Sequence, residues 1–273
     1  MRFPLRLTAD LALGLATRTL RGANPHRLIL HLSPVIGSAS PSRIREGSSP
    51  ASDSDLQLLS SDVCLDAVRR SSAPIVWIGG PEPVLHPEIG RLARRIVDAG
   101  RHVFVHTDGA LLQRRIHEFR PVSRLFLAVQ FDGFEQSHDR RARREGAFRD
   151  AIEGIRTAKL SGFLVCAHIA VHADTELAEF ERLRGYLEER DVDGFVVVPG
   201  KGFPQAESLQ NESEPVRRKL RAARGGIRSR RWRLFSQLLE SSQRAPHGTV
   251  TSEQELGSGG AADSACEESV PVS

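Results

Sequence analysis

Apolar and polar residues alternate along the chain in a way that predicts strands and helices in turn. Short apolar runs rich in β-branched and aromatic residues predict strands, whereas apolar residues three or four positions apart predict helices. The predicted strands are Leu28–Leu32, Ile75–Ile78, His102–Val105, Leu125–Phe131, Phe163–Val171 and Gly194–Val198. The predicted helices between them are Ser61–Arg70, His86–Ala99, Ala110–Phe119, Gly146–Leu160 and Thr175–Glu189.

The six predicted strands are apolar on both faces, which is typical of a parallel α/β sheet covered by helices. Such a sheet is either an open doubly wound sheet or a (β/α)6 partial TIM barrel. Both arrangements place functional residues at the carboxyl ends of the strands. The residues expected there are Ser33, 79–82, 106–108, 130–132, 168–172 and 199–201.

Two flanking segments differ from this pattern. At the N-terminus, Thr8 to Leu20 predicts an amphipathic helix with Thr8 as its N-cap and Gly22 as its stop. We expect it to pack on the body of the protein, with contact to a membrane surface as the alternative. At the other end, Arg217 to Arg233 is strongly basic, and Arg244 to Ser273 is poor in large apolar residues and is predicted to be disordered.

These patterns predict four regions. They are an N-terminal amphipathic helix (1–25), a (β/α)6 barrel (26–205), a basic helical extension (206–243) and a disordered tail (244–273).

Charge and cysteine content narrow the functional classes only in part. The net charge of +4 and the pI of about 9.4 are compatible with anionic ligands, nucleic acid or acidic lipid. The three cysteines, Cys64, Cys166 and Cys266, are widely spaced, which excludes a CxxC motif and a disulfide framework. A reducing, cytoplasmic location is therefore predicted.

Five ordered segments resemble the radical S-adenosylmethionine (SAM) superfamily, and they resemble most the branch that attaches an adenosyl group to hopene, a triterpene lipid. The segments are IGGPEPVLHPEI (78–89), HTDGALL (106–112), VQFDGFEQSHDR (129–140), GAFRDAIEGIRTAKLSGF (146–163) and DGFVVVPG (193–200). The resemblance spans about residues 28–203. It implies the (β/α)6 partial barrel and a SAM site that includes Gly79, Gly80, Glu82, Pro83, Thr107, Asp108 and Asp132.

The same resemblance exposes a departure from the family pattern. The family holds a [4Fe–4S] cluster through a CxxxCxxC motif in the loop after the first strand. Here Ser38, Ser42 and Arg45 occupy the three positions, and none of them is a soft ligand for iron. Pro81 also replaces a glycine of the family's SAM-binding turn and removes a backbone N–H.

Three hypotheses about function follow. The first is a degenerate radical-SAM-like protein without the cluster, acting as a binding or accessory subunit beside an active paralogue. It would bind SAM, a related nucleotide or an apolar molecule. The second is an active radical SAM enzyme that uses unusual cluster ligands or a partner's cysteines on an isoprenoid-like lipid. The third is a binder of anionic surfaces or nucleic acid through Arg217–Arg233.

Two smaller alternatives concern single sites. His106, His168 and His172, with Asp108 or Asp132, could bind a metal ion, although scattered histidines are more often hydrogen-bonded core or surface residues. The run His138-Asp139-Arg140 is predicted to cap and pair within the loop before the next helix.

Overall fold

A curled parallel sheet forms the centre of the molecule. The computed structural model describes residues 3–20, 28–37, 56–200, 214–244 and 249–250. The strand order is β8-β7-β6-β5-β4-β1-β9, and every neighbouring pair is parallel. The main strands are β1 (Ile29–Leu32), β4 (Ile75–Ile78), β5 (His102–Thr107), β6 (Leu125–Phe131), β7 (Leu164–Val171) and β8 (Gly194–Pro199). This arrangement confirms the predicted partial barrel.

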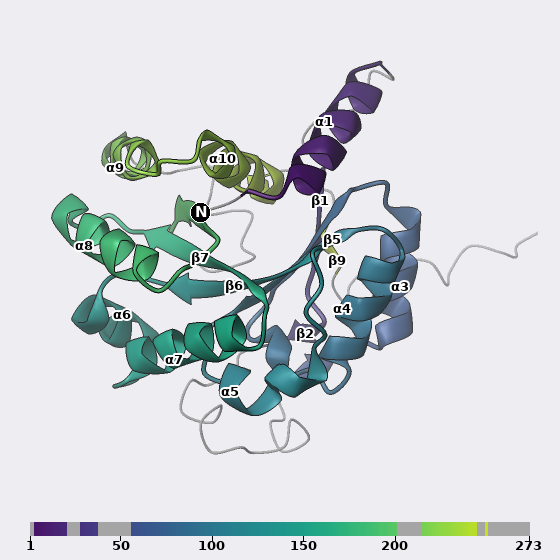
Figure 1. The fold of residues 1–273 in the computed structure, drawn as a ribbon, viewed down its shortest axis with the longest axis horizontal. Coiled ribbons are helices and arrows are strands. Elements are labelled where there is room, and N and C mark those ends of the chain that lie inside the picture. The colour runs from purple at the N-terminus through teal and green to yellow at the C-terminus, as the bar shows by residue number, and fades with distance from the viewer. Residues whose placement is uncertain (1–2, 21–27, 38–55, 201–213, 245–248, 251–273) are drawn as a thin grey trace, which may run out of the picture.

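Helices cover both faces of the sheet (Figure 1). Those on the outer, convex side follow the strands in the chain. They are α3 (Ser61–Arg70), α4 (Ile89–Asp98), α5 (Leu112–Arg115), α6 (Glu135–Ala142), α7 (Ala147–Leu160) and α8 (Leu177–Glu188), with the 3-10 turns η2 (Pro83–Leu85) and η3 (Ile116–Glu118). Their apolar stripes, such as Ile89, Leu92 and Ile96 of α4, are fully buried.

The opposite side of the sheet is closed by the two flanking regions of the chain. Helices α1 (Leu5–Leu20), α9 (Glu214–Gly225) and α10 (Arg230–Arg244) lie there (Figure 1). Helix α10 contacts both β8 and β1, so it crosses the opening between the two sides of the curled sheet. A short strand, β9 (Thr249–Val250), pairs with β1 and comes from the segment predicted to be disordered; the rest of that tail lies outside the described residues, apart from Arg244 at the end of α10.

Aromatic side chains join α10 to the concave face. Trp77, Phe104 and Phe126 are in register on three neighbouring strands, and Phe104 stacks on Phe126 at a centroid distance of 4.6 Å. From α10, Phe235 stacks on Phe104 at 4.9 Å, and Trp232 lies so close to Gly194 that a Cβ there would be 1.9 Å from the indole. Gly194 is therefore needed for this packing.

Some local predictions were wrong. Helix α1 begins at Leu5, so Thr8 is an interior residue whose hydroxyl donates to the Pro4 carbonyl rather than an N-cap. The basic extension is not among these errors: it is helical and divides into α9 and α10, with the break after Gly225. His138-Asp139-Arg140 lies in helix α6 and not in a loop, although Asp139 does cap the next helix by accepting from Gly146 and Phe148 N–H groups.

Within the described residues, no helix combines the length and the apolar character that a membrane crossing requires.

Candidate functional site

The site is built at the carboxyl ends of β1, β4, β5, β6 and β7. A small hairpin holds the end of β1 in place: β2 (Val35–Ile36) pairs antiparallel with β3 (Gln57–Leu58), and the Leu59 N–H donates to the Pro34 carbonyl. The pairing of β2 with β3 brings the two ends of the connection between them close to the carboxyl end of β1. The positions predicted for the lost cluster ligands, Ser38, Ser42 and Arg45, are in that loop and lie outside the described residues.

The turn after β4 packs directly against this hairpin. Gly80 has a φ of +109°, and a Cβ at this position would lie 2.7 Å from the Val35 carbonyl oxygen. Both observations require glycine here. Pro81 is exposed, whereas Pro83 is buried at the start of η2.

Glu82 joins this turn to the end of β5. Its carboxylate is 1% exposed and accepts three hydrogen bonds, from Val84 N–H (3.0 Å), the Thr107 hydroxyl (3.0 Å) and Asp108 N–H (2.9 Å). Burial, with the charge of Asp108, raises the pKa of Glu82 well above its ordinary value despite these donors. The structure therefore brings Gly80, Glu82, Thr107 and Asp108 together as predicted, with the Glu82 side chain bonded within the protein.

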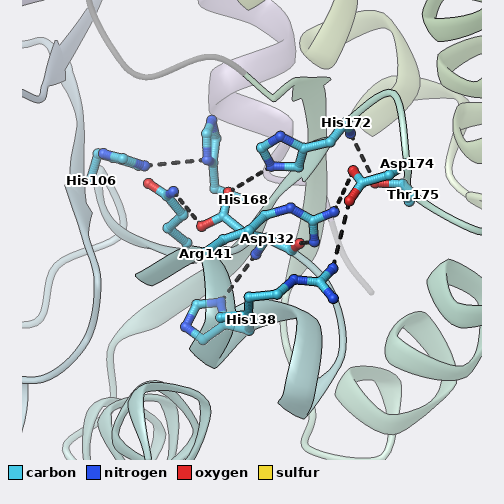
Figure 2. A network of polar contacts seen from close by, with 10 residues as sticks. His106, Asp132, His138, Arg141, His168, His172, Asp174 and Thr175 are labelled. Atoms are coloured by element: carbon cyan, nitrogen blue, oxygen red, sulfur yellow. Dashed lines mark hydrogen bonds and ion pairs between the residues drawn. The ribbon is translucent and has the colours of Figure 1, made fainter. Parts of the chain in front are cut away.

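A second group of polar side chains surrounds Asp132 at the end of β6 (Figure 2). Its carboxylate lies 3.1 Å from His172 Nε2 and accepts from Gln130 Nε2 at 2.8 Å. Burial alone would raise the pKa of Asp132, but the hydrogen bonds from His172 and Gln130 and the nearby histidines lower it overall. Asp132 is therefore ionised near neutral pH.

The backbone of Asp132 is held as firmly as its side chain. Its N–H lies 3.1 Å from His138 Nδ1, and its carbonyl accepts from Arg141, which also binds Asp174 at 2.6 Å. Both partners come from α6. This helix has little signal in the sequence, because its eight residues, EQSHDRRA, have no apolar stripe.

His106 and His168 form a buried pair on the concave face. His106 Nε2 lies 3.2 Å from His168 Nδ1, and the two rings meet edge to face at 4.5 Å. The Trp77 indole lies 5.9 Å from one ring and 5.5 Å from the other. Figure 2 shows the pair beside the Asp132 group. Gln130 links the two, because it forms hydrogen bonds with both Asp132 and His106.

Burial keeps both imidazoles neutral. It lowers the pKa of His106 to about 4, against the charge of Asp132 and a hydrogen bond with Gln130. Burial, together with the neighbouring His106, lowers the pKa of His168 well below its ordinary value. His168 Nε2 is buried without a hydrogen-bond partner among the described residues, and so is Ser33 Oγ at the end of β1. Buried polar atoms of this kind are costly, and they are typical of sites that a ligand or water completes.

Among the described residues, no set of side chains forms a metal site. No group of three or more His, Cys, Asp or Glu side chains in this part of the chain could hold a metal ion, so the metal alternative at His106, His168 and His172 gains no support. Cys64 lies in α3 and Cys166 in the middle of β7; both are buried. Burial raises the pKa of Cys64 to about 11 and that of Cys166 further, so neither thiol is a ready ligand.

The chain is similar to known proteins of one family. The model of the family described as the radical SAM superfamily matches residues 46–187, more than half of the chain. An "AdoMet-dependent heme synthase" of Methanosarcina barkeri is 33% identical over 101 residues, which are 36% of this chain and 29% of that protein.

Solved structures share the fold. Streptococcus suis SuiB bound to the precursor peptide SuiA matches with a TM-score of 0.52 at 11% identity, over 77% of this chain and 50% of that one. SuiB bound to S-adenosylmethionine matches with a TM-score of 0.50 at 14% identity, over 71% and 46%. The chain thus spans half or less of the length of these relatives. By the match of its family model, the chain belongs to the radical SAM superfamily.

Proposed function

We propose that this protein is a radical SAM superfamily member without the iron–sulfur cluster and without reductive SAM cleavage, and that it acts as a binding or accessory subunit. The proposal rests on where the thiols are. No cysteine occurs between residues 28 and 63, and Cys64 and Cys166 are buried away from the strand ends. The family model matches residues 46–187, so the three positions lie before the matched stretch.

The site retains features that suit a small polar ligand. The turn at Gly80 is held by Glu82, and unpartnered polar atoms of Ser33 and His168 belong to neighbouring strand ends. We infer that SAM, a related nucleotide or an apolar molecule with a polar end binds there. Without a cluster to chelate its amino and carboxylate groups, SAM would bind more weakly than in active members.

Reconstitution with iron and sulfide under anaerobic conditions tests the loss of the cluster. The protein as it exists should acquire neither stoichiometric iron nor the broad visible absorbance of a cluster. A matched variant with Ser38→Cys, Ser42→Cys and Arg45→Cys should acquire both, because it restores three thiolates at the family's spacing. Stoichiometric iron in the unaltered protein, together with 5′-deoxyadenosine formation, would overturn the proposal.

Ligand binding can be followed through Trp77, which contacts both histidines of the buried pair. The chain has two tryptophans, so a Trp232→Phe variant leaves Trp77 as the single reporter. Titration with SAM should change its fluorescence, and the change should be lost in His168→Phe. An unchanged signal with SAM and with nucleotides would exclude polar ligands of this class.

An accessory subunit needs a partner, and the cysteines indicate the compartment in which the two would meet. Free, buried Cys64 and Cys166 suit a reducing cytoplasm, and an active paralogue would supply the cluster chemistry. The remaining hypothesis, an active enzyme that borrows a partner's cysteines to act on a hopanoid-like lipid, is distinguished by repeating the iron measurement with the co-purified partner present.

A further inference from the structure

Helix α1 exposes apolar residues on its outer face. Leu5, Leu13 and Leu15 are 76%, 63% and 46% exposed, and Ala9, Ala12 and Ala16 are exposed between them. A helix on the surface of a protein in water normally turns polar residues outward. This helix instead has leucine and alanine along its solvent side.

The inner face of α1 is already occupied. Leu7 is fully buried, Phe3 meets Trp232 edge to face at 4.9 Å, and a Cβ on Gly14 would touch Leu28. Asp10, the one acidic residue of the helix, points inward and lies 2.8 Å from His102 and 3.1 Å from Arg124. The outer face therefore has no carboxylate in its described part; its charged residue is the exposed Arg6.

Exposed arginines lie on the neighbouring helices. Figure 1 shows α1, α9 and α10 on the same side of the sheet. Arg224 is buried against the Val197 carbonyl and Glu240, and Arg221 pairs with Glu214, so these two members of the basic segment Arg217–Arg233 already have partners. Five other arginines are exposed and form no ion pair among the described residues: Arg217, Arg218, Arg228, Arg230 and Arg231.

One further exposed leucine lies on α10. Leu234 is 54% exposed, one helical turn from Arg230 and Arg231. The aromatic residues of this helix, Trp232 and Phe235, are buried in the core. Exposed leucines favour a lipid surface over a nucleic acid, since nucleic acids gain from aromatic stacking and not from leucine.

We infer that this leucine–arginine surface (Leu5, Leu13, Leu15, Leu234 and the five arginines) docks the protein onto an anionic lipid bilayer. The leucines enter the interface between head groups and acyl chains, and the arginines bind the phosphates. The inference is independent of the proposed function, because the surface is built from the helices that flank the barrel and contains no residue of the strand-end site.

Co-sedimentation of the full chain with lipid vesicles tests the inference. The protein should bind vesicles of phosphatidylcholine mixed with phosphatidylglycerol, bind those of phosphatidylcholine alone at least about tenfold more weakly, and release as salt rises. Leu5→Gln with Leu13→Gln should weaken binding about tenfold or more. Arg230→Gln with Arg231→Gln should weaken it by about fivefold for each charge removed.

Matched variants elsewhere on the surface control for general effects. Leu160 and Leu177 are 79% and 40% exposed on α7 and α8, and their replacement by glutamine should leave vesicle binding unchanged. Arg91→Gln with Arg94→Gln on α4 controls for lost charge, and circular dichroism should show every variant folded. Failure of the unaltered protein to bind anionic vesicles would overturn the inference, as would equal losses in the control variants. Dimerisation that Leu13→Gln abolishes, or binding of single-stranded RNA in place of vesicles, would assign the surface to another partner and would also overturn it.

Discussion

The concave face of the sheet has two layers that contain different chemistry although the same strands supply both. Toward the middle and the amino ends, Phe104 and Phe126 stack and α10 seals them with Trp232 and Phe235. One pleat further along, His106 and His168 contact each other and Trp77 of the sheet, and the His168 Nε2 has no hydrogen-bond partner in the described structure. The aromatic layer satisfies its own packing, whereas the histidine layer leaves hydrogen-bonding capacity unused. This difference locates the candidate site at the histidine layer.

Removing Trp232, which covers the aromatic layer, should have the largest effect on the free energy of unfolding. Trp232→Ala deletes a fully buried indole that contacts Phe3, Phe126 and Gly194, and its N–H bond to the Asp193 carbonyl. The free energy of unfolding in urea should fall by about 3–5 kcal/mol. Leu160→Ala, at an exposed position, should change it by less than about 0.5 kcal/mol. If the two variants lose the same free energy of unfolding, the packing of α10 against the sheet does not stabilise the protein.

Acid should destabilise the protein through the histidine layer. The unfolded chain protonates His106 near pH 6.5, but the folded protein keeps it neutral down to about pH 4. The unfolded state therefore binds more protons in this window, and stability falls by roughly 3 kcal/mol as pH falls through it. Stability curves of His106→Gln should lose that part of the acid dependence. Parallel curves for the variant and the unaltered protein would contradict the buried, neutral state of His106.

Glu82 should respond to pH in the opposite direction. Its folded pKa is raised, so its contribution to stability is complete below the unfolded value of 4.5 and is lost as pH rises through the folded pKa. Glu82→Gln presents an amide NH2 to the Thr107 and Asp108 donors and should cost about 1–2 kcal/mol near pH 5. The cost should shrink as pH rises, measured by urea unfolding at several pH values; a constant cost would show that Glu82 is ionised when folded.

The smallest effect on stability should come from replacing the histidine pair as a whole. His106→Phe with His168→Phe removes both members of the pair, and Gln130 keeps its hydrogen bond to Asp132, so stability should stay within about 1 kcal/mol of the unaltered protein. His168→Phe alone leaves His106 Nε2 without its partner and should cost more, about 1–3 kcal/mol. If the double variant is less stable than His168→Phe, the pair stabilises the fold. It would then not be a polar site that lowers the stability of the protein.

The predicted strands agree with the structure because their signal is local. Ile75–Ile78 is apolar at every position and is buried at every position, and the middles of β6 and β8 are likewise apolar and buried. Strand β7 is buried in its middle as well, but it includes His168 there. Strand alternation also put His106 and His168 on one face, from which their proximity could be predicted. Burial on both faces requires an apolar sequence, and such a sequence can be read without knowing what covers it.

Elements without an apolar stripe were missed. Helix α6 is polar throughout, and the structure stabilises it through contacts of His138 and Arg141 with Asp132. The start of α1 at Leu5 depends on Phe3 packing against Trp232, which lies more than two hundred residues away. The strand pairs β2–β3 and β1–β9 likewise depend on partners distant in the chain.

The sequence by itself determined the family, the parallel α/β sheet and the absence of cysteines from the loop after the first strand. These follow from local patterns and from residue identity, which folding does not alter. Tertiary structure alone decided that α10 fills the aromatic half of the concave face, that Arg224 is buried, and that the outer face of α1 is exposed. The physical reason is that burial, pKa and exposure depend on which distant segments come to lie against a residue, and a linear pattern does not specify them.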